Sequence, residues 1–533
     1  MKKSEMFRRV GLGLFATLLS CATFCQDQPA EGASAAARSL IDRGRYADAL
    51  RVVDEGIGGA PSDPALRMCQ IDALLGLHRD LDARQVALSQ RSLGPGFQFK
   101  AAVATAKLGR ALESVEMLRP LYTDEDWAGP SYEASVRALL ACGKESEAKA
   151  LLDEAFQKVQ GPPVGLLRQS LVLNTSQASS LAVLDKLVAA DPGKASQYQA
   201  LAKVYGAADG NMFQEVIEGR LPATITVKER VERLETASLR WGNATLSGGG
   251  ATSWDLSANE SGKTGTQSTP PRVVVGGIIN GDRREMLALD STCDVMLIAS
   301  KVAKKLNLRP LAPGEYDGVG LQGGVKSQWV LIKQLQVGPL RFINIPALVI
   351  SEKTAYWKET GGIIPLWMFR HFGLHYDRRH GKLTLLPTGT APDQAVGWGN
   401  IQVRSLWFES VPYLETRIQD KSPCFLKLAT VNVGTYVEER RVQDLGMTLK
   451  TSQYGPQRER GLFGLMSSGV ADNVRLDLGA TRINLPTVLI ANLCPDCEVD
   501  CAGLLGRNVL DLFDIYIDYQ ANVLALKGYE MGK

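Results

Sequence analysis

The sequence predicts a chain of two structural classes, an all-α repeat region followed by an all-β domain with two similar halves. Glycine-centred turns recur in the first part at Gly44, Gly76, Gly109 and Gly143, so the spacing between successive turn glycines is nearly constant. From Val273 onward, glycine, short β-branched runs and turn residues dominate, and these are typical of many short strands. Within that second part, one pattern occurs twice.

Residues 1–21 have the composition of an export signal. Basic residues precede an apolar run, Val10–Leu19, which is too short to span a bilayer. Cys21 follows Leu-Leu-Ser, which resembles a bacterial lipobox, and the same residues also suit an ordinary signal peptidase. We therefore expect an exported protein of the periplasm or cell envelope. Two alternatives stay open: a lipid anchor on Cys21, which would be its only link to a membrane, or plain secretion.

The overall composition is that of an ordinary globular protein with several domains. The chain has 533 residues, of which 45% are hydrophobic and 22% are charged. Because the formal net charge is only +3, nucleic acid is not an expected partner. The chain has four histidines, so a histidine-based metal site or catalytic triad is not expected either. We predict no metal and no cofactor.

Residues 33–220 carry a helix–turn–helix unit that repeats along the chain. Apolar residues stand at helical spacing on both sides of each turn, as at Val136, Leu139 and Leu140. A period of about 34 residues is the tetratricopeptide signature, and such repeats stack into a solenoid whose concave face binds peptides or proteins. We expect a protein partner there, and a spacer without its own ligand is the alternative. Residues 221–272 are predicted to form a helical segment and a flexible linker.

The all-β part is organised around one acid, Asp290. Two strand-like runs flank Asn280-Gly281, the strongest short hairpin signal, because both residues tolerate positive φ. Asp290 ends the second run and is followed by two hydroxyl residues, Ser291 and Thr292. The pattern therefore predicts a carboxylate at the point where a hairpin strand leaves its sheet.

This arrangement resembles the aspartic peptidases, and in particular their bacterial retropepsin-like branch. In that family the acid opens an Asp-Thr/Ser-Gly turn, and two such turns face each other across a pseudo-dyad. Here Thr292 stands in place of the glycine, which permits the tight turn in the family. The resemblance implies an all-β, two-lobed acid-protease barrel domain, with lobes at 273–387 and 388–533. It also implies that Asp290 is catalytic, with Ser291 and Thr292 supporting its turn.

The two predicted lobes form an internal duplication, and the second copy departs from the family at one position. Phe372 matches Phe513, and nearly the same shift applied to Asp290 arrives at Ala429-Thr430. The family needs its second aspartate where this chain has Ala429. Catalysis there depends on two carboxylates that share one proton and divide the roles of acid and base. We therefore predict a degenerate partner turn at Ala429 and Thr430 and impaired catalysis.

Three functions are consistent with this sequence. The preferred one is a protein that binds a peptide or protein segment in the cleft between the lobes without turnover. The second is an active aspartic endopeptidase that uses Asp290, and the third is a scaffold of the cell envelope. Glycines near two hairpin tips are candidate substrate-binding flap residues, namely Gly318, Gly320, Gly323, Gly324, Gly461 and Gly464. Plain turn chemistry is the alternative for each of them.

Four cysteines in the second lobe are candidates for one disulfide bond. Cys424, Cys494, Cys497 and Cys501 contain a C-x2-C-x3-C run, for which a metal site would need a fourth ligand. Exported proteins more often oxidise such thiols, so we predict a disulfide-closed loop whose pairing stays open. Cys293, close to the acid, is predicted to be a small buried residue rather than a nucleophile.

Overall fold

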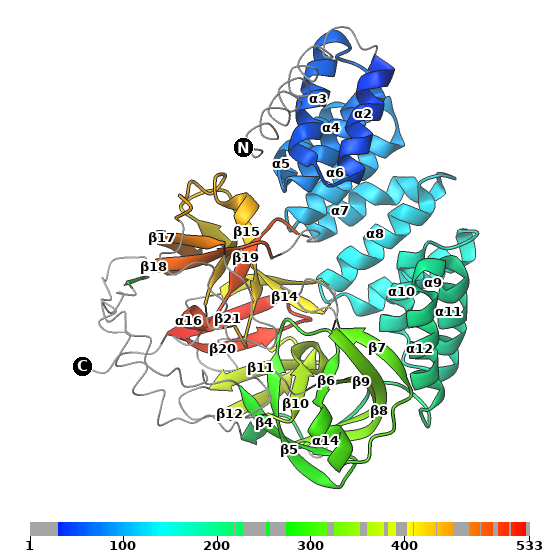
Figure 1. The fold of residues 1–533 in the computed structure, drawn as a ribbon, viewed down its shortest axis with the longest axis vertical. Helices are drawn as coiled ribbons and strands as arrows, with labels where there is room; N and C mark the ends of the chain where they lie inside the picture. Colours follow the sequence, from blue (N-terminus) through cyan, green and yellow to red (C-terminus); the bar gives the residue numbers. More distant parts are fainter. Residues whose placement is uncertain are drawn as a thin grey trace, which may run out of the picture. The chain divides into compact units, whose positions relative to one another are not determined.

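The computed structural model of the chain describes the helical repeats and most of the β domain (Figure 1). It divides into two compact units, Met1–Ala104 and Thr105–Lys533, so the division falls among the helical repeats. The described residues are 30–217, 220–226, 252–255, 273–316, 325–351, 360–377, 382–390, 402–408, 410–432, 434–450, 468–479, 481–493, 499–510 and 513–528.

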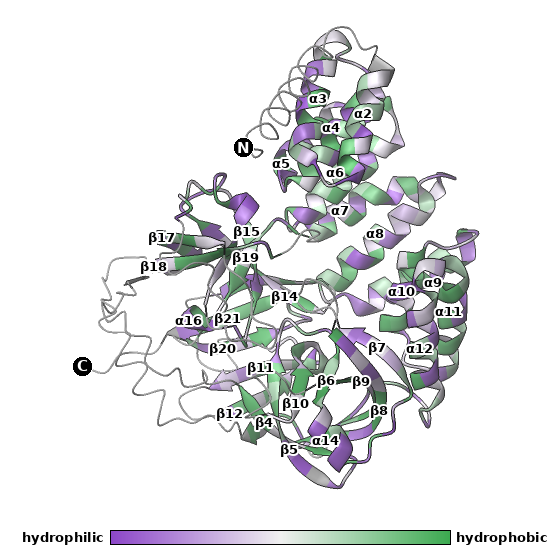
Figure 2. Ribbon diagram, viewed as in Figure 1, coloured by the Kyte–Doolittle hydropathy of each residue, from purple (hydrophilic) through white to green (hydrophobic). Residues whose placement is uncertain are grey.

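Paired α-helices build the first part of the chain, which confirms the predicted all-α repeats. The pairs begin with α2 (Ala30–Asp42), α3 (Tyr46–Gly59), α4 (Pro64–Gly76), α5 (Asp80–Ser89) and α6 (Pro95–Lys107). They continue with α7 (Ala111–Leu118), α8 (Ala128–Ala141), α9 (Glu145–Lys158), α10 (Val164–Leu173), α11 (Gln177–Ala190) and α12 (Ala195–Gly206). Figure 2 shows hydrophobic and hydrophilic residues interspersed along these helices, as amphipathic packing requires.

The glycines of the repeat turns act in two ways. Gly44, Gly109 and Gly143 have positive φ of 71°, 77° and 65°, which lets one helix end and the next begin within a few residues. Gly76 differs, because it is the last residue of α4 and His78 takes the positive φ of 56° instead. A side chain at position 76 would overlap the Tyr46 ring, so this glycine permits close helix packing.

Strands follow the last helix where the sequence predicted helix and linker. β1 (Gln214–Ile217) lies inside the predicted helical region, and β2 (Ala223–Thr226) lies inside the predicted helical segment and linker. β1 pairs antiparallel with β9, and β2 pairs antiparallel with β12. Both are short, β-branched segments. β1 covers the part of β9 that does not pair with β6, and β2 covers the edge strand β12, so backbone groups that would otherwise lack partners are paired. Most of the predicted linker lies outside the described residues, and its β3 (Thr252–Asp255) pairs with β18.

Lobe 1 is a closed barrel. In the described part of the chain, the ring runs β5-β10-β6-β9-β8-β4 and returns to β5. Its strands are β4 (Val274–Ile279), β5 (Arg283–Asp290), β6 (Met296–Ala299), β8 (Val325–Val337), β9 (Leu340–Ile350) and β10 (Gly362–Pro365), with β7 (Ala312–Tyr316) paired to β8 and helix α14 (Ser300–Lys305) after β6. The predicted hairpin turn joins β4 to β5, with positive φ of 54° at Asn280 and 74° at Gly281.

Lobe 2 repeats the ring of lobe 1 pair by pair. Its described strands are β14 (Val411–Ile418), β15 (Cys424–Leu428), β16 (Tyr436–Glu438), β17 (Gly469–Leu478), β18 (Thr481–Ala491) and β19 (Cys501–Leu505), with α16 (Arg507–Leu510) after β19. The ring runs β15-β19-β16-β18-β17-β14 and returns to β15. The pairs β5–β10 and β15–β19 are parallel, as are β6–β9 and β16–β18, and the other ring pairs are antiparallel in both lobes. The internal duplication is therefore a duplication of topology.

One sheet joins the two barrels across a pseudo-twofold axis. It contains β11 (Phe372–Asp377), β12 (Lys382–Pro387), β13 (Gln402–Phe408), β20 (Phe513–Asp518), β21 (Val523–Gly528) and β2. β11 and β20 pair antiparallel at its centre, and His375 lies directly opposite Tyr516. These two residues are also counterparts in the duplication, because the shift that relates Phe372 to Phe513 relates His375 to Tyr516. The pseudo-twofold axis therefore passes between them.

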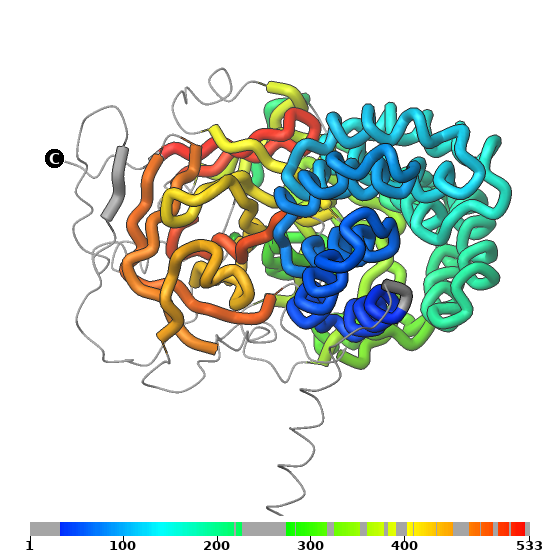
Figure 3. Tube along the Cα trace, turned by 90° about the horizontal axis from the view of Figure 1, so that it is seen from above, coloured from blue at the N-terminus to red at the C-terminus, as the bar shows by residue number. Residues whose placement is uncertain are grey.

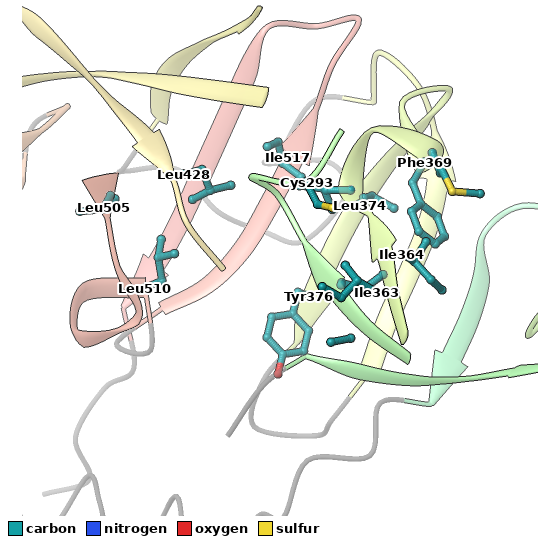
Figure 4. Packing of buried hydrophobic residues seen from close by; sticks show 14 of the residues in the cluster. Cys293, Ile363, Ile364, Phe369, Leu374, Tyr376, Leu428, Leu505, Leu510 and Ile517 are labelled. Atoms are coloured by element: carbon teal, nitrogen blue, oxygen red, sulfur yellow. The ribbon is translucent and has the colours of Figure 1, made fainter. Parts of the chain in front are cut away.

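The hydrophobic core of the β domain is continuous through both lobes and the joining sheet. Figure 4 shows side chains from both lobes in this cluster, among them Ile364 of lobe 1 and Leu428 of lobe 2. Figure 3 follows lobe 2 as the yellow-to-red part of the tube. A second core joins lobe 2 to the helices α7 to α10, where Tyr132 and Val136 of α8 are buried in one cluster with Phe425. These helices therefore form part of the same compact unit as the β domain.

Candidate functional site

The candidate acid, Asp290, is the last residue of β5 and pairs with Pro365 of β10. Its side chain is 5% exposed. The carboxylate Oδ1 accepts hydrogen bonds from the Thr292 amide at 2.8 Å and from the Thr292 hydroxyl at 2.7 Å. The residue that replaces the family's glycine thus orients the acid through its own side chain, which a glycine could not do.

The two predicted turns meet and exchange hydrogen bonds. The Ser291 amide donates to Thr430 Oγ1 at 3.1 Å, and the Thr430 amide donates to Ser291 Oγ at 3.1 Å. Each hydroxyl then donates to a carbonyl of the opposite lobe: Ser291 Oγ to Leu428 O, and Thr430 Oγ1 to Leu289 O at 3.2 Å. Because each turn supplies the partners of the other, the two strand ends are held in a fixed relation.

Ala429 occupies the position in lobe 2 that Asp290 occupies in lobe 1. Leu428 pairs with Leu505 in lobe 2, as Leu289 pairs with Ile364 in lobe 1, so the two parallel pairs have the same register. The next residues are Ala429 and Asp290. Ala429 is fully buried, and its amide donates to Leu505 O at 3.0 Å. Of the two equivalent positions, only the one in lobe 1 therefore carries a carboxylate.

A buried thiol and a buried phenol lie beside the acid. Cys293 is 1% exposed, and its Sγ lies 3.4 Å from the Tyr316 hydroxyl. Burial, with a further contribution from the Asp290 and Asp294 carboxylates, raises the pKa of the Cys293 thiol well above its usual range. Burial likewise raises the pKa of Tyr316. Both groups are protonated at neutral pH, so Cys293 is not an activated nucleophile. Sequence reasoning missed Tyr316, because only the fold brings it to the acid.

A small apolar cavity lies beside the paired turns. Its volume is about 50 Å³, and its lining includes the equivalent residues Leu289 and Leu428 and the joining sheet. Side chains alternate along a strand, so Leu289 points away from the face that carries the Asp290 carboxylate. The lining combines residues of both lobes, among them Thr430 of the paired turns. It also contains Arg507, which is 3% exposed and whose counterpart in lobe 1 of the duplication is Leu366. No motif in the sequence marks this arginine as a site residue.

Several predicted site residues lie outside the described residues. These are Cys21, the six flap glycines Gly318, Gly320, Gly323, Gly324, Gly461 and Gly464, and two of the four lobe-2 cysteines, Cys494 and Cys497. The other two, Cys424 and Cys501, are buried with free thiols. The predicted disulfide in this group, with its pairing left open, stays a prediction.

Within the described residues, no cluster of three or more His, Cys, Asp or Glu side chains is arranged to hold a metal ion. Of the helices that the structure describes, none combines the length and the apolar character needed to cross a bilayer.

Two barrels of one topology, joined by a shared sheet and by paired turns with an acid at the end of β5, define an aspartic protease-like domain. Tetratricopeptide-like repeats precede it. Residues 275–364 match the family model described as aspartyl protease, and this span includes Asp290. No curated protein matches the chain.

Solved structures of both classes resemble parts of the chain. The aspartic proteinase from Irpex lacteus is 10% identical, with 49% of this chain and 94% of that one covered at a TM-score of 0.31. A retropepsin-like aspartic protease from Rickettsia conorii is 15% identical, with 21% and 81% covered at a TM-score of 0.17. A thermophilic TPR protein from Thermus thermophilus is 17% identical, with 33% and 98% covered at a TM-score of 0.28.

Proposed function

We propose that the β domain binds an extended peptide or protein segment between its two lobes and does not hydrolyse it. The observation that carries this proposal is Ala429, which stands at the counterpart position of Asp290 in the same strand register. Peptide hydrolysis by this kind of site needs one carboxylate to activate water and a second to donate a proton to the scissile carbonyl. A methyl group can do neither.

The hydroxyl groups beside the acid do not replace the missing carboxylate. Ser291 donates its hydroxyl proton to Leu428 O, and Thr430 donates its own to Leu289 O. Both protons are therefore committed to the contact between the lobes. Cys293 is buried and protonated, so it does not supply a nucleophile. Asp290 alone, oriented by Thr292, can accept a hydrogen bond from a peptide or from water.

The binding half of the proposal rests on the intact junction of the lobes. The paired turns keep four hydrogen bonds between the lobes, so the loss of the second acid has not separated the two barrels. A junction that places a single buried carboxylate between two barrels suits an extended chain that offers backbone amide donors. Extended peptides bind sheet-rich clefts mainly through such main-chain hydrogen bonds.

An active endopeptidase is the second candidate, and one observation favours it. Asp290 is retained, buried and oriented by two hydrogen bonds within the span that matches the aspartyl protease model. We further propose export to the periplasm or cell envelope, which the basic and apolar composition of residues 1–21 supports. We also propose a protein partner on the helical repeats, which the repeat architecture supports.

Peptide selection on the full-length protein tests the proposal. Wild type and Asp290→Asn are exposed to a random decapeptide library, and the retained peptides are eluted and sequenced by mass spectrometry. We expect both proteins to retain peptides, and wild type to release them intact. Pepstatin, which occupies aspartic-peptidase clefts, should compete with the retained peptides. If neither protein retains any peptide, the binding function is wrong. If wild type returns fragments where Asp290→Asn returns intact peptides, the endopeptidase is the correct alternative.

A further inference from the structure

The turn between helices α8 and α9 contacts both lobes of the β domain. On the lobe 2 side, the Tyr519 hydroxyl donates to Leu140 O at 2.6 Å, and the Asn522 side-chain amide donates to Cys142 O at 2.6 Å. Both donors lie in the turn between β20 and β21. Gly143 has a positive φ of 65°, and a side chain there would overlap the Tyr519 carbonyl, so only glycine suits this approach.

The same turn contacts lobe 1 through Glu145, the first residue of α9. Its carboxylate accepts from Arg370 Nε at 2.8 Å and lies 3.2 Å from His371 Nε2. His371 Nδ1 in turn lies 3.0 Å from the Glu215 carboxylate of β1. The side chains of Glu145 and Arg370 are 23% and 13% exposed, so this pair is better shielded from solvent than a surface salt bridge.

Glu145 and His371 are both charged near neutral pH. Burial opposes the ionisation of Glu145, but hydrogen bonds and charges from His371 and Arg370 prevail and lower its pKa to about 2. Hydrogen bonds to Glu145 and Glu215 raise the pKa of His371 to about 9. Carboxylates and cations in direct contact make strong, directional hydrogen bonds, so the cluster fixes the position of Arg370.

Arg370 connects the cluster to the loop of the candidate acid. Its guanidinium carbon lies 5.3 Å from the centre of the Trp367 ring, which also meets the Phe213 ring edge-on at 5.2 Å. The Trp367 indole N–H donates to Asp294 O at 2.8 Å. Asp294 closes the loop that begins at Asp290. Trp367 belongs to the short helix Leu366–Phe369, which directly follows Pro365, the residue paired with Asp290.

We propose that the α8–α9 turn of the helical repeats positions the Asp290 loop, through Glu145, Arg370 and Trp367. This inference rests on the proposed function only in taking the Asp290 turn as part of the peptide site. It assigns Glu145 and Trp367 as positioning residues, since Glu145 reaches the loop through Arg370 and Trp367 reaches it through the Asp294 carbonyl.

Hydrogen exchange of the full-length protein tests the inference without any ligand. Glu145→Gln keeps the size of the side chain and removes its charge, and Trp367→Phe keeps an aromatic ring and removes the N–H. Each variant should speed exchange of the Ser291 and Thr292 amides by about fivefold, the effect of losing one ordinary hydrogen bond. Glu147→Gln is the matched control, because Glu147 lies in the same turn of α9, is 61% exposed and pairs only with Lys144 among the described contacts.

In the control, Glu147→Gln, exchange of the Ser291 and Thr292 amides should equal that of wild type. Unchanged exchange at Ser291 and Thr292 in both Glu145→Gln and Trp367→Phe would overturn the inference. A uniform rise over the whole chain in both variants would also overturn it, because that result indicates general loosening. The same variants are then used in peptide selection. Failure of wild type to retain peptide would end the proposed function but leave the exchange result standing, so the two failures are distinguishable.

Discussion

Removal of one hydroxyl group tests whether the paired turns hold the β domain together. Thr430→Val keeps the shape of the side chain and deletes Oγ1, which donates to Leu289 O at 3.2 Å and accepts from the Ser291 amide at 3.1 Å. Both backbone groups then lie unpaired beside a methyl group. A stranded polar group costs about 1–3 kcal/mol, and Thr430 is half-buried, so we expect a total loss of about 2–4 kcal/mol.

Urea unfolding followed by tryptophan fluorescence measures this loss in the transition of the β domain. Thr487→Val is the matched control, because the Thr487 hydroxyl donates to Asp472 Oδ1 at 2.9 Å on an exposed part of lobe 2. Its loss should stay within about 0.5 kcal/mol. Ser291→Ala/Thr430→Val should cost less than the sum of the two single changes, since each single change already strands the partner. Equal losses of unfolding free energy in Thr430→Val and Thr487→Val would show that the paired turns do not hold the β domain together.

Two further predictions concern the contact between the repeats and the β domain. Gly143→Ala and Gly161→Ala should each introduce about 1–2 kcal/mol of backbone strain, because the φ values at these positions are 65° and 67°. Only position 143 faces a backbone carbonyl, so calorimetry should show the larger fall in Tm for Gly143→Ala, and equal falls would contradict the docked turn. The fold lowers the pKa of Glu145 from 4.5 to about 2. Its contribution to folding stability is therefore fully present above pH 4.5 and is lost as the pH falls toward 2. The fold raises the pKa of His371 from 6.5 to about 9. Its contribution to folding stability is therefore fully present below pH 6.5 and is lost as the pH rises toward 9. The Tm difference between wild type and His371→Asn should therefore be largest near pH 5–6.5 and shrink by pH 9, and a difference independent of pH would contradict this.

Local signals in the sequence are sufficient to predict much of the β domain. Asn280-Gly281 predicts the hairpin because positive φ at two successive positions is a property of the residues themselves. The duplication is visible because both lobes bury equivalent residues at nearly constant spacing. For the same reason, the shift from Asp290 to Ala429 also pairs Ser291 with Thr430, which exchange hydrogen bonds in the structure. The roles of these residues in binding or catalysis stay predictions.

Contacts between distant segments cannot be predicted from the sequence. β2 completes the joining sheet by pairing with β12, although the two strands are far apart in the chain, and its four residues carry no signal of that partner. Glu145 has the pattern of an ordinary helix-start acid, and only the fold brings it to Arg370. In the sequence, Thr292 marks the loss of a turn glycine. Its hydroxyl instead orients Asp290, an effect that depends on side-chain geometry rather than on residue type.

A site that keeps Asp290 but has Ala429 at the counterpart position should not hydrolyse peptides. The most direct measurement is cleavage of a peptide library by wild type, Asp290→Asn and Ala429→Asp between acidic and neutral pH, with products identified by mass spectrometry. Wild type should release no more fragments than Asp290→Asn. New cleavage by Ala429→Asp alone would identify that residue as the cause of the silence. Cleavage by wild type that disappears in Asp290→Asn would contradict the proposal that the β domain binds peptides without hydrolysing them.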